Sequence, residues 1–157
     1  MAIPLNIVTD RLSQRMTLED LVKLFESIIG MSEDGIYVCN KEGRTLLVNE
    51  ALLTVTNIAA ETFYKYSLHE LINKKILPDS CAFQTLQTKN KHDMIIKYYD
   101  GKKAVITSTP VFDKKGEIFC IVSNVRNITE LNNLHEKLKE SNRRNVEYRN
   151  LLFNKEQ

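Results

Sequence analysis

Apolar and polar residues alternate with a period of two through much of the second half of the chain. Such alternation predicts strands with one buried face. It runs through residues 92–99 (HDMIIKYY), 103–112 (KAVITSTPVF) and 117–125 (EIFCIVSNV), and turn sequences occupy residues 100–102 (DGK) and 113–116 (DKKG). Three consecutive strands joined by short turns predict an antiparallel meander.

The first half of the chain contains a second pair of strand patterns. Residues 35–40 (GIYVCN) and 44–49 (RTLLVN) are separated by the turn sequence 41–43 (KEG). Glycine suits such a turn because it accepts a positive φ without strain. The pattern predicts a β-hairpin ahead of the meander.

Capping signals between these two groups predict short helices. Asn49 directly precedes an apolar segment and is placed to cap a helix. Ser67 and Glu70 have the spacing of a capping box, and a further short helix is predicted at residues 81–88 (CAFQTLQT). We therefore expect an α+β fold, with a five-stranded antiparallel sheet covered on one face by short helices and a small cleft between the layers.

A one-sided apolar pattern predicts an amphipathic helix at residues 17–31. Thr17 can cap it, and Glu19 and Asp20 follow in the first turn, where the helix dipole favours acidic groups. Its apolar residues recur at steps of three and four, at Leu18, Leu21, Val22, Phe25, Ile28 and Ile29. Leaving such side chains in water forgoes about 1.5–3 kcal/mol each. We expect Phe25 and Ile28 to take part in dimerisation.

A second one-sided pattern follows Thr129. The spacing alternates between three and four residues at Leu131, Leu134, Leu138, Ser141, Asn145, Tyr148 and Leu152. This is the seam of a coiled coil, weakened where Ser141 and Asn145 place polar groups on it. We expect Leu131, Leu134 and Leu138 to form part of a homodimer interface. The weak pairing suits a helix that shifts between two states.

The chain then divides into an N-terminal extension (1–16), the amphipathic helix (17–31), a core (32–128) and a C-terminal coiled-coil-like signalling helix (129–157). With 157 residues it has room for one domain and terminal extensions. Hydrophobic residues make up 43% and charged residues 27%, as in ordinary globular domains. No run approaches the roughly 18 apolar residues of a membrane span, and no secretory signal opens the chain. We expect a cytoplasmic location without membrane association.

Charge and cysteine spacing exclude several functions. The formal net charge is +2 with acidic and basic residues interspersed, so we expect no direct nucleic-acid binding. Cys39, Cys81 and Cys120 lie about forty residues apart and have no zinc or redox spacing, so we expect buried thiols. The three histidines, His69, His92 and His135, show no metal-binding pattern.

Catalytic motifs are also missing from the sequence. It contains no Gly-x-Ser-x-Gly sequence, phosphate-binding glycine loop or metal-hydrolase motif. We expect no catalytic residues, no metal site and no enzyme activity. The remaining route to an enzyme would be an Asp or His base in the cleft.

Three segments resemble the PAS domain family, over about residues 24–138. Residues 26–52 are similar to the family's first hairpin and the Asn-x-Ala after it, and residues 71–75 (LINKK) resemble its Leu-Ile-Gly-Lys segment. Residues 110–134 (PVFDKKGEIFCIVSNVRNITELNNL) closely resemble PAS domains at the front of bacterial activators that work with sigma-54 RNA polymerase. That resemblance implies a downstream output domain, an AAA+ ATPase that contacts this polymerase. A histidine kinase or a cyclic-dinucleotide enzyme is the alternative output.

The resemblance also implies residues for signal relay and limits the cofactors. Asn127-Ile128-Thr129 stands where the family has Asp-x-Thr, which ties the last strand to the exit helix, and Arg126 matches the arginine before it. Asn127 lacks the charge of the usual aspartate. Residues 81–87 contain no histidine for haem and no arginine of the flavin-binding motif, so we expect neither cofactor.

Polar residues near the cleft are candidates for contacts with an unknown small-molecule ligand. They are Asn49, Thr107, Thr109 and Asn124. Asn49 is explained first as a helix cap, as is usual for an asparagine between a strand and a helix. A period of two leaves open which strand residues face inward, and cross-strand pairing or solvent exposure explains the other three equally well. We expect a sensory and dimerisation module that relays ligand binding through the C-terminal helix. The alternative is a ligand-free dimerisation module of a regulator or histidine kinase, with the cleft filled by side chains.

Overall fold

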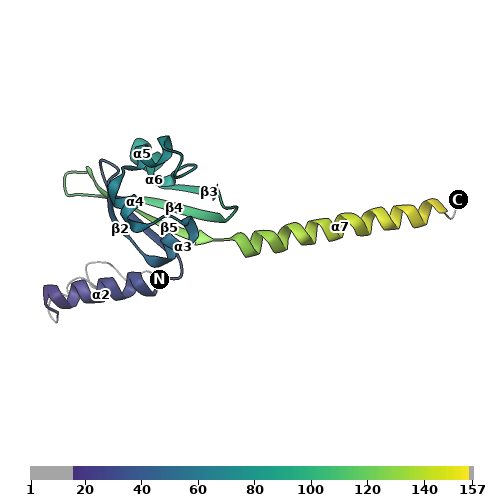
Figure 1. Cartoon of the computed structure of the whole chain (residues 1–157), viewed down its shortest axis with the longest axis horizontal. Coiled ribbons are helices and arrows are strands. Elements are labelled where there is room, and N and C mark those ends of the chain that lie inside the picture. Colours follow the sequence, from purple (N-terminus) through teal and green to yellow (C-terminus); the bar gives the residue numbers. More distant parts are fainter. Residues whose placement is uncertain (1–15, 156–157) are drawn as a thin grey trace.

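A single antiparallel sheet forms the centre of the computed structural model, which describes residues 16–155 (Figure 1). The strands are β1 (Gly35–Asn40), β2 (Thr45–Val48), β3 (His92–Lys97), β4 (Lys103–Phe112) and β5 (Ile118–Asn127). Their order is β2-β1-β5-β4-β3, and every neighbouring pair is antiparallel. The predicted hairpin and meander are therefore both present, and β1 joins them by pairing with β5.

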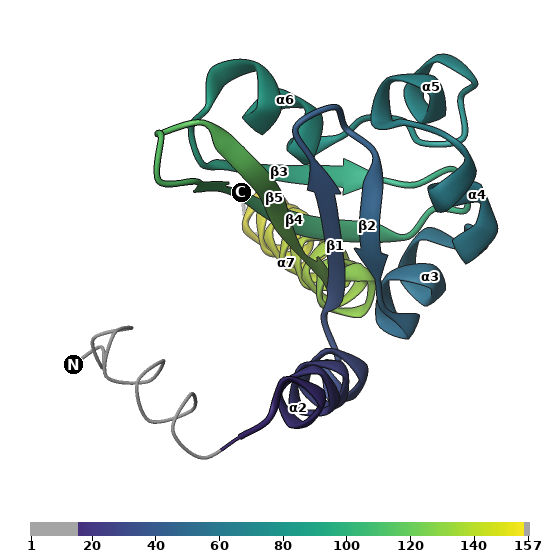
Figure 2. The ribbon, with the colours of Figure 1, turned by 90° about the vertical axis from the view of Figure 1, so that its left-hand side faces the viewer.

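Four short helices cover one face of this sheet (Figure 2). They are α3 (Glu50–Thr56), α4 (Ala60–Lys65), α5 (Leu68–Asn73) and α6 (Cys81–Thr88). Helix α6 packs on β3, β4 and β5, α3 packs on β1, and α4 packs near β2. The predicted α+β fold is confirmed, with one helical layer on one sheet.

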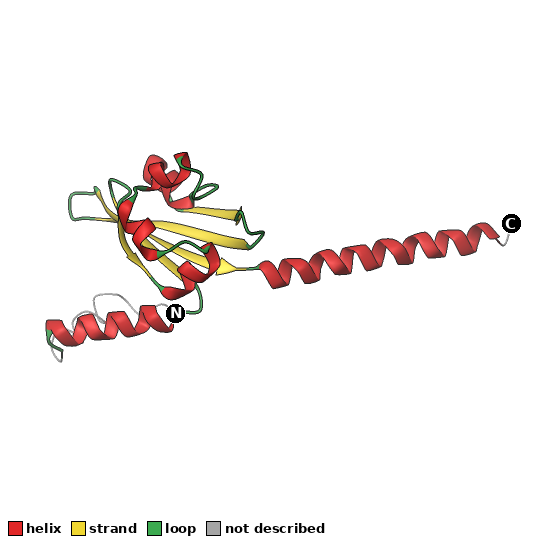
Figure 3. Ribbon diagram, in the orientation of Figure 1, coloured by secondary structure: helices red, strands yellow, loops and turns green. Residues whose placement is uncertain are grey.

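Two longer helices lie outside these layers (Figure 3). Helix α2 (Leu18–Met31) precedes β1, and α7 (Thr129–Lys155) projects away from the sheet after β5. Neither helix contains a buried residue. The extension assigned to residues 1–16 lies, except for Met16, outside the described residues.

Side-chain caps explain where most helices begin. Asn49 accepts a hydrogen bond from the backbone N–H of Leu52, and Ser67 and Glu70 form the predicted capping box. Thr17 and Asp20 form a second capping box at the start of α2. Helix α4 has no side-chain cap, so no capping motif indicates where it begins.

The hydrophobic core lies between the sheet and helices α3–α6. Its largest fully buried apolar side chains are Phe63, Leu68, Leu71 and Ile121. Gly35 brings β1 against α3, because a Cβ at this position would lie 2.9 Å from the Leu52 Cα. Gly43 takes the positive φ, +73°, that the turn between β1 and β2 requires. The core is thus formed by both layers and leaves the outer face of the sheet uncovered.

Strand β5 is longer than the alternation predicted. It continues to Asn127 because Arg126 and Asn127 pair with Val105 and Ala104 of β4. The relay residues therefore belong to the end of the sheet itself, and α7 begins two residues later.

Within residues 16–155, every helix is too short or too polar to cross a lipid bilayer.

Candidate functional site

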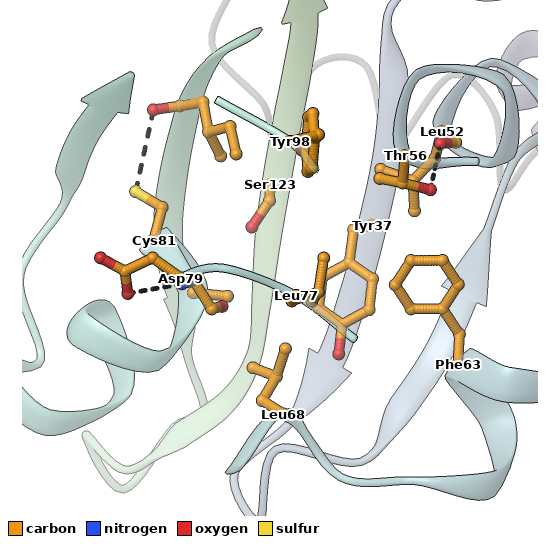
Figure 4. A pocket seen from close by; sticks show the side chains of 13 residues that line it. Tyr37, Leu52, Thr56, Phe63, Leu68, Leu77, Asp79, Cys81, Tyr98 and Ser123 are labelled. Carbon is orange, nitrogen blue, oxygen red and sulfur yellow. Dashed lines mark hydrogen bonds between the residues drawn. The ribbon is translucent and has the colours of Figure 1, made fainter. Parts of the chain in front are cut away.

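A cavity lies between the sheet and the helical layer (Figure 4). Its volume is about 40 Å³. The residues lining it come from both layers and are Tyr37, Leu52, Thr56, Phe63, Leu68, Leu77, Asp79, Ser80, Cys81, Ala82, Tyr98, Ile106 and Ser123. The cleft expected from the two-layer fold is therefore present as a mostly apolar internal cavity.

The volume of the cavity limits what it can hold in this conformation. One water needs about 10–15 Å³ measured in this way, so about 40 Å³ holds a few waters. Pockets for drug-sized molecules span about 300–1,000 Å³. The aromatic rings of Tyr37 and Phe63, with centroids 5.8 Å apart, fill much of the space between the layers. A metabolite-sized ligand therefore requires side chains to move.

Polar groups in the cavity wall have partners within the protein. The Ser123 and Ser108 hydroxyl oxygens lie 2.7 Å apart, and both side chains are buried. The Cys81 thiol donates to the His92 carbonyl oxygen at 3.3 Å. Among the described residues, no buried side-chain nitrogen or oxygen lacks a hydrogen-bond partner. The wall is thus complete without a ligand.

The electrostatics of the cavity favour neutral occupants. Of the described residues that line it, Asp79 alone carries a charge, and its side chain is exposed. Burial raises the pKa of Tyr98 to about 12 and raises the pKa of Tyr37 as well, so both phenols stay neutral at physiological pH. Among the described residues, no lysine, arginine or histidine lines the cavity, so no positive charge there would offset the charge of a buried anion.

Three of the predicted ligand contacts lie on the opposite face of the sheet. Thr107 and Thr109 alternate along β4 with Ile106 and Ser108, which are buried, and Asn124 follows Ser123 on β5. The Thr107 hydroxyl donates to Asp93 at 2.6 Å, on the solvent side. The structure therefore brings Ser123 to the cavity instead of these three residues. The alternation of polar and apolar residues predicted the strands correctly, but it did not show which face of each strand lies toward the cavity.

Asn49, the fourth predicted contact, is buried but does not line the cavity. Its Oδ1 accepts hydrogen bonds from the backbone N–H groups of Ile36, at 2.7 Å, and Leu52, at 3.1 Å. Its Nδ2 donates to the carbonyl oxygens of Ile29, at 3.1 Å, and Asp34, at 3.0 Å. Both amide protons and two acceptor positions are used, so the side chain joins α2, β1 and α3.

The predicted relay residues meet at the junction of β5 and α7. Asn127 Oδ1 accepts hydrogen bonds from the Thr129 backbone N–H at 3.0 Å and the Thr129 hydroxyl at 2.6 Å. The Thr129 hydroxyl oxygen accepts from the Lys103 N–H at 3.0 Å, and the Ile128 N–H donates to the Lys103 carbonyl oxygen at 2.9 Å. The start of α7 is thus fixed to both β4 and β5. Asn127 provides this connection without a negative charge.

Arg126 has a partner that the sequence did not indicate. Its Nη2 lies 3.0 Å from Asp34 Oδ2 and its Nε lies 3.3 Å from Oδ1, which makes a two-point ion pair. Asn124 Nδ2 also donates to Asp34, at 3.3 Å. The hydrogen bond from Arg126 lowers the pKa of the Asp34 carboxyl below its ordinary value. Asp34 lies just before β1, so this pair connects the two ends of the core.

The predicted dimerisation residues are all exposed in the single chain. Between 53% and 68% of the surface of each is accessible, for Phe25, Ile28, Leu131, Leu134 and Leu138. In the described part of the chain, no three His, Cys, Asp or Glu side chains converge on one point.

The sequence pattern of the PAS domain matches residues 33–130, which include the whole sheet and the junction. The chain belongs to the PAS domain family. PAS domains act as sensory modules in multidomain signalling proteins and commonly dimerise. The match covers the core and the start of α7 but not α2.

Solved structures share this PAS fold. The PAS domain of Bordetella pertussis BvgS is 23% identical with a TM-score of 0.53, over 78% of this chain and 98% of that one. An RNA-binding light-oxygen-voltage receptor is 13% identical with a TM-score of 0.58, and the match covers 80% of this chain but only 38% of the receptor. A PAS domain from a two-component sensor histidine kinase is 15% identical with a TM-score of 0.50, over 71% and 99%. No curated protein sequence matches the chain.

Proposed function

We propose that this PAS domain is the sensory and dimerisation module of a bacterial signalling or transcriptional regulatory protein, and that α7 carries its signal to an output domain. The observation behind this proposal is the junction of Asn127, Thr129 and Lys103. It fixes one end of a 27-residue helix to two strands of the sheet. A change in the twist of β4 and β5 then changes the direction of α7.

The length of α7 amplifies such a change. Its 27 residues extend about 40 Å at about 1.5 Å per residue. By this geometry a rotation of about 5° at Thr129 moves the far end by roughly 3.5 Å. Pairing of Leu131, Leu134 and Leu138 with a second copy would hold two such helices together, so that a rotation in both domains alters their separation.

The output domain is proposed from the resemblance of residues 110–134 to PAS domains of sigma-54 activators. On that basis α7 leads to an AAA+ ATPase that contacts sigma-54 RNA polymerase. A histidine kinase is the second candidate, because a PAS domain from such a kinase shares this fold. Both candidates agree with an exposed leucine-lined helix at the C-terminal side of the core.

Sedimentation of the Leu131→Asp/Leu138→Asp variant tests the dimerisation step. We expect its dimer dissociation constant to rise by about tenfold or more, since tenfold corresponds to only about 1.4 kcal/mol. The control Asn132→Asp/Asn133→Asp adds the same charge beside the seam and should leave the dimer intact. A dimer of unchanged strength in the leucine variant would remove α7 from the mechanism.

We further propose that a ligand can bind in this cavity, and the volume of the cavity limits the size of that ligand. At about 40 Å³ the cavity favours a core filled by its own side chains over a preformed ligand pocket. The apolar wall with the Ser123 hydroxyl would suit a small neutral molecule, once Tyr37 or Phe63 moves aside.

Native mass spectrometry and a thermal-shift panel of small neutral molecules separate these two views. A ligand at 100 times its dissociation constant stabilises the fold by about 2.7 kcal/mol. A bound mass in the purified protein, or a shift with one compound that is lost in Ser123→Ala, supports ligand binding. No bound mass and no shift supports the ligand-free dimerisation module.

A further inference from the structure

Helix α2 is held to the core by a side-chain hydrogen bond at its last turn. It has no buried residue, so apolar packing in the single chain does little to set its direction. Asn49 Nδ2 donates both to the Ile29 carbonyl oxygen, in the last turn of α2, and to the Asp34 carbonyl oxygen. The end of α2 and the residue before β1 are therefore held by one amide group.

Asp34 continues this connection across the sheet. While its carbonyl oxygen accepts from Asn49, its carboxylate accepts from Arg126 and Asn124 of β5. Arg126 directly precedes Asn127, which holds Thr129 at the start of α7. Hydrogen bonds and a single stretch of backbone thus run without a break from the last turn of α2 to the first turn of α7.

We propose that Asn49, Asp34 and Arg126 form a coupling link that fixes the direction of α2 relative to α7. A rotation of either helix then reaches the other across the surface of the sheet, without a rearrangement of the core. Asp34 has the central role, because its carbonyl oxygen accepts from Asn49 beside α2 and its carboxylate accepts from Arg126 near the start of α7. The link does not depend on a ligand or on the dimer, so it can be tested independently of the proposed function.

The geometry of the ion pair suits orientation more than stability. The Arg126 side chain is 68% exposed, and exposed ion pairs contribute little to the free energy of folding. A two-point contact between a guanidinium and a carboxylate nevertheless fixes the relative direction of the two groups. Removal of either partner should therefore loosen α2 against α7 while the core stays folded.

Electron–electron distance measurement between spin labels tests this coupling directly in the 157-residue chain. Labels on Glu26→Cys in α2 and Glu136→Cys in α7 report the distance between the helices, and an excess of unlabelled chain suppresses distances between subunits. The native thiols, Cys39, Cys81 and Cys120, are buried, and protein without the introduced cysteines shows their background. We expect one narrow distance distribution in the parent protein.

Two single variants and a charge exchange provide the comparison. Asp34→Ala and Arg126→Ala should each broaden the distribution about twofold. The Asp34→Ala/Arg126→Ala double variant should broaden it no further than one substitution, because both remove the same link. The exchanged pair Asp34→Arg/Arg126→Asp should narrow the distribution again.

Arg44→Ala is the matched control. Arg44 forms another exposed ion pair, with Glu70 at 3.8 Å, that connects neither terminal helix to the other. The Arg44→Ala substitution should leave the distance distribution between the two labels unchanged. The proposal is overturned if both single variants keep the parent width while showing a cooperative thermal transition, or if Arg44→Ala broadens the distribution equally.

Discussion

The inner face of the sheet and the two terminal helices use apolar residues in opposite ways. Between the inner face and the helices that cover it, Leu71 of α5 and Ile121 of β5 are completely buried and pack against residues of the same chain. On α2 and α7, Phe25 and Leu131 are mostly exposed. The core therefore folds on contacts that the chain supplies itself, whereas the helices expose surface that a second copy would cover. Stability and association should respond to different substitutions.

Two phenylalanines, one in α4 and one in β5, show the same contrast between a buried and an exposed apolar side chain. Phe63 of α4 is 2% exposed and packs against Tyr37, whereas Phe119 of β5 is 65% exposed, at the irregularity in the pairing of β5 with β4. The residue type is the same, so the difference between their substitutions measures the environment. This pair gives the largest expected effect.

Phe63→Ala should lower the free energy of unfolding by about 3–5 kcal/mol, because it removes buried apolar surface and leaves a cavity. Phe119→Ala should change it by no more than about 0.5 kcal/mol. Urea denaturation followed by circular dichroism measures both. Equal losses in the two variants would mean that Phe119 is covered in solution, and the contrast between buried and exposed positions would fail.

A smaller effect is expected from the serine pair at the cavity wall. Ser123→Ala leaves the completely buried Ser108 hydroxyl without the partner that now lies 2.7 Å away. An unpaired buried hydroxyl costs about 1–3 kcal/mol, so stability should fall by that amount. The Ser108→Ala/Ser123→Ala double variant should lose less than the sum of the single losses, because it leaves no hydroxyl unpaired.

Ser141→Ala on α7 is the control for this cycle, since Ser141 is exposed and should change stability little. Chemical denaturation of the parent protein, Ser108→Ala, Ser123→Ala and the double variant gives the coupling free energy between the two hydroxyls. Strictly additive losses at Ser108 and Ser123 would show that the two hydroxyls do not depend on each other, and the paired wall would then be wrong.

Local chemistry explains which parts of the fold could be predicted from the sequence. The capping box of Ser67 and Glu70 and the strand at residues 35–40 depend on residues within a few positions of each other. Helix α4 escaped prediction because Ala59 offers no side-chain cap. The end of β5 was placed two residues early because its continuation depends on pairing with β4, which local alternation does not report.

The candidate site was harder to predict because it depends on contacts far apart in the sequence. Polar residues occupy both alternating sets on β4 and β5, with Thr107 and Asn124 in one set and Ser108 and Ser123 in the other. A period of two defines the sets but not the one that the helices cover. Arg126 and Asp34 are separated by 92 positions, so only the pairing of β1 with β5 brings them together.

The smallest expected effect concerns the stability of the protein at alkaline pH, which depends on whether a thiol is buried or exposed. Burial of Cys39 on the inner face raises its pKa from an ordinary 9.0 to about 12. Above pH 9 the unfolded chain loses this proton while the folded chain keeps it, so the stability that is fully present below pH 9 decreases as the pH rises toward 12. At pH 10 the loss from this one thiol is about 1.4 kcal/mol relative to pH 8.

Cys39→Ala should therefore flatten the decrease in stability between pH 8 and pH 10 by about that amount, whatever its effect at neutral pH. Denaturation at several pH values measures the slope. Cys120→Ala is the control, because burial also raises the pKa of Cys120 but its thiol lies outside the main core cluster, and its substitution should leave most of the slope. If Cys39→Ala keeps the full slope, the Cys39 thiol ionises in the folded protein, and the inner face at β1 is open to water rather than closed by α3 and α4.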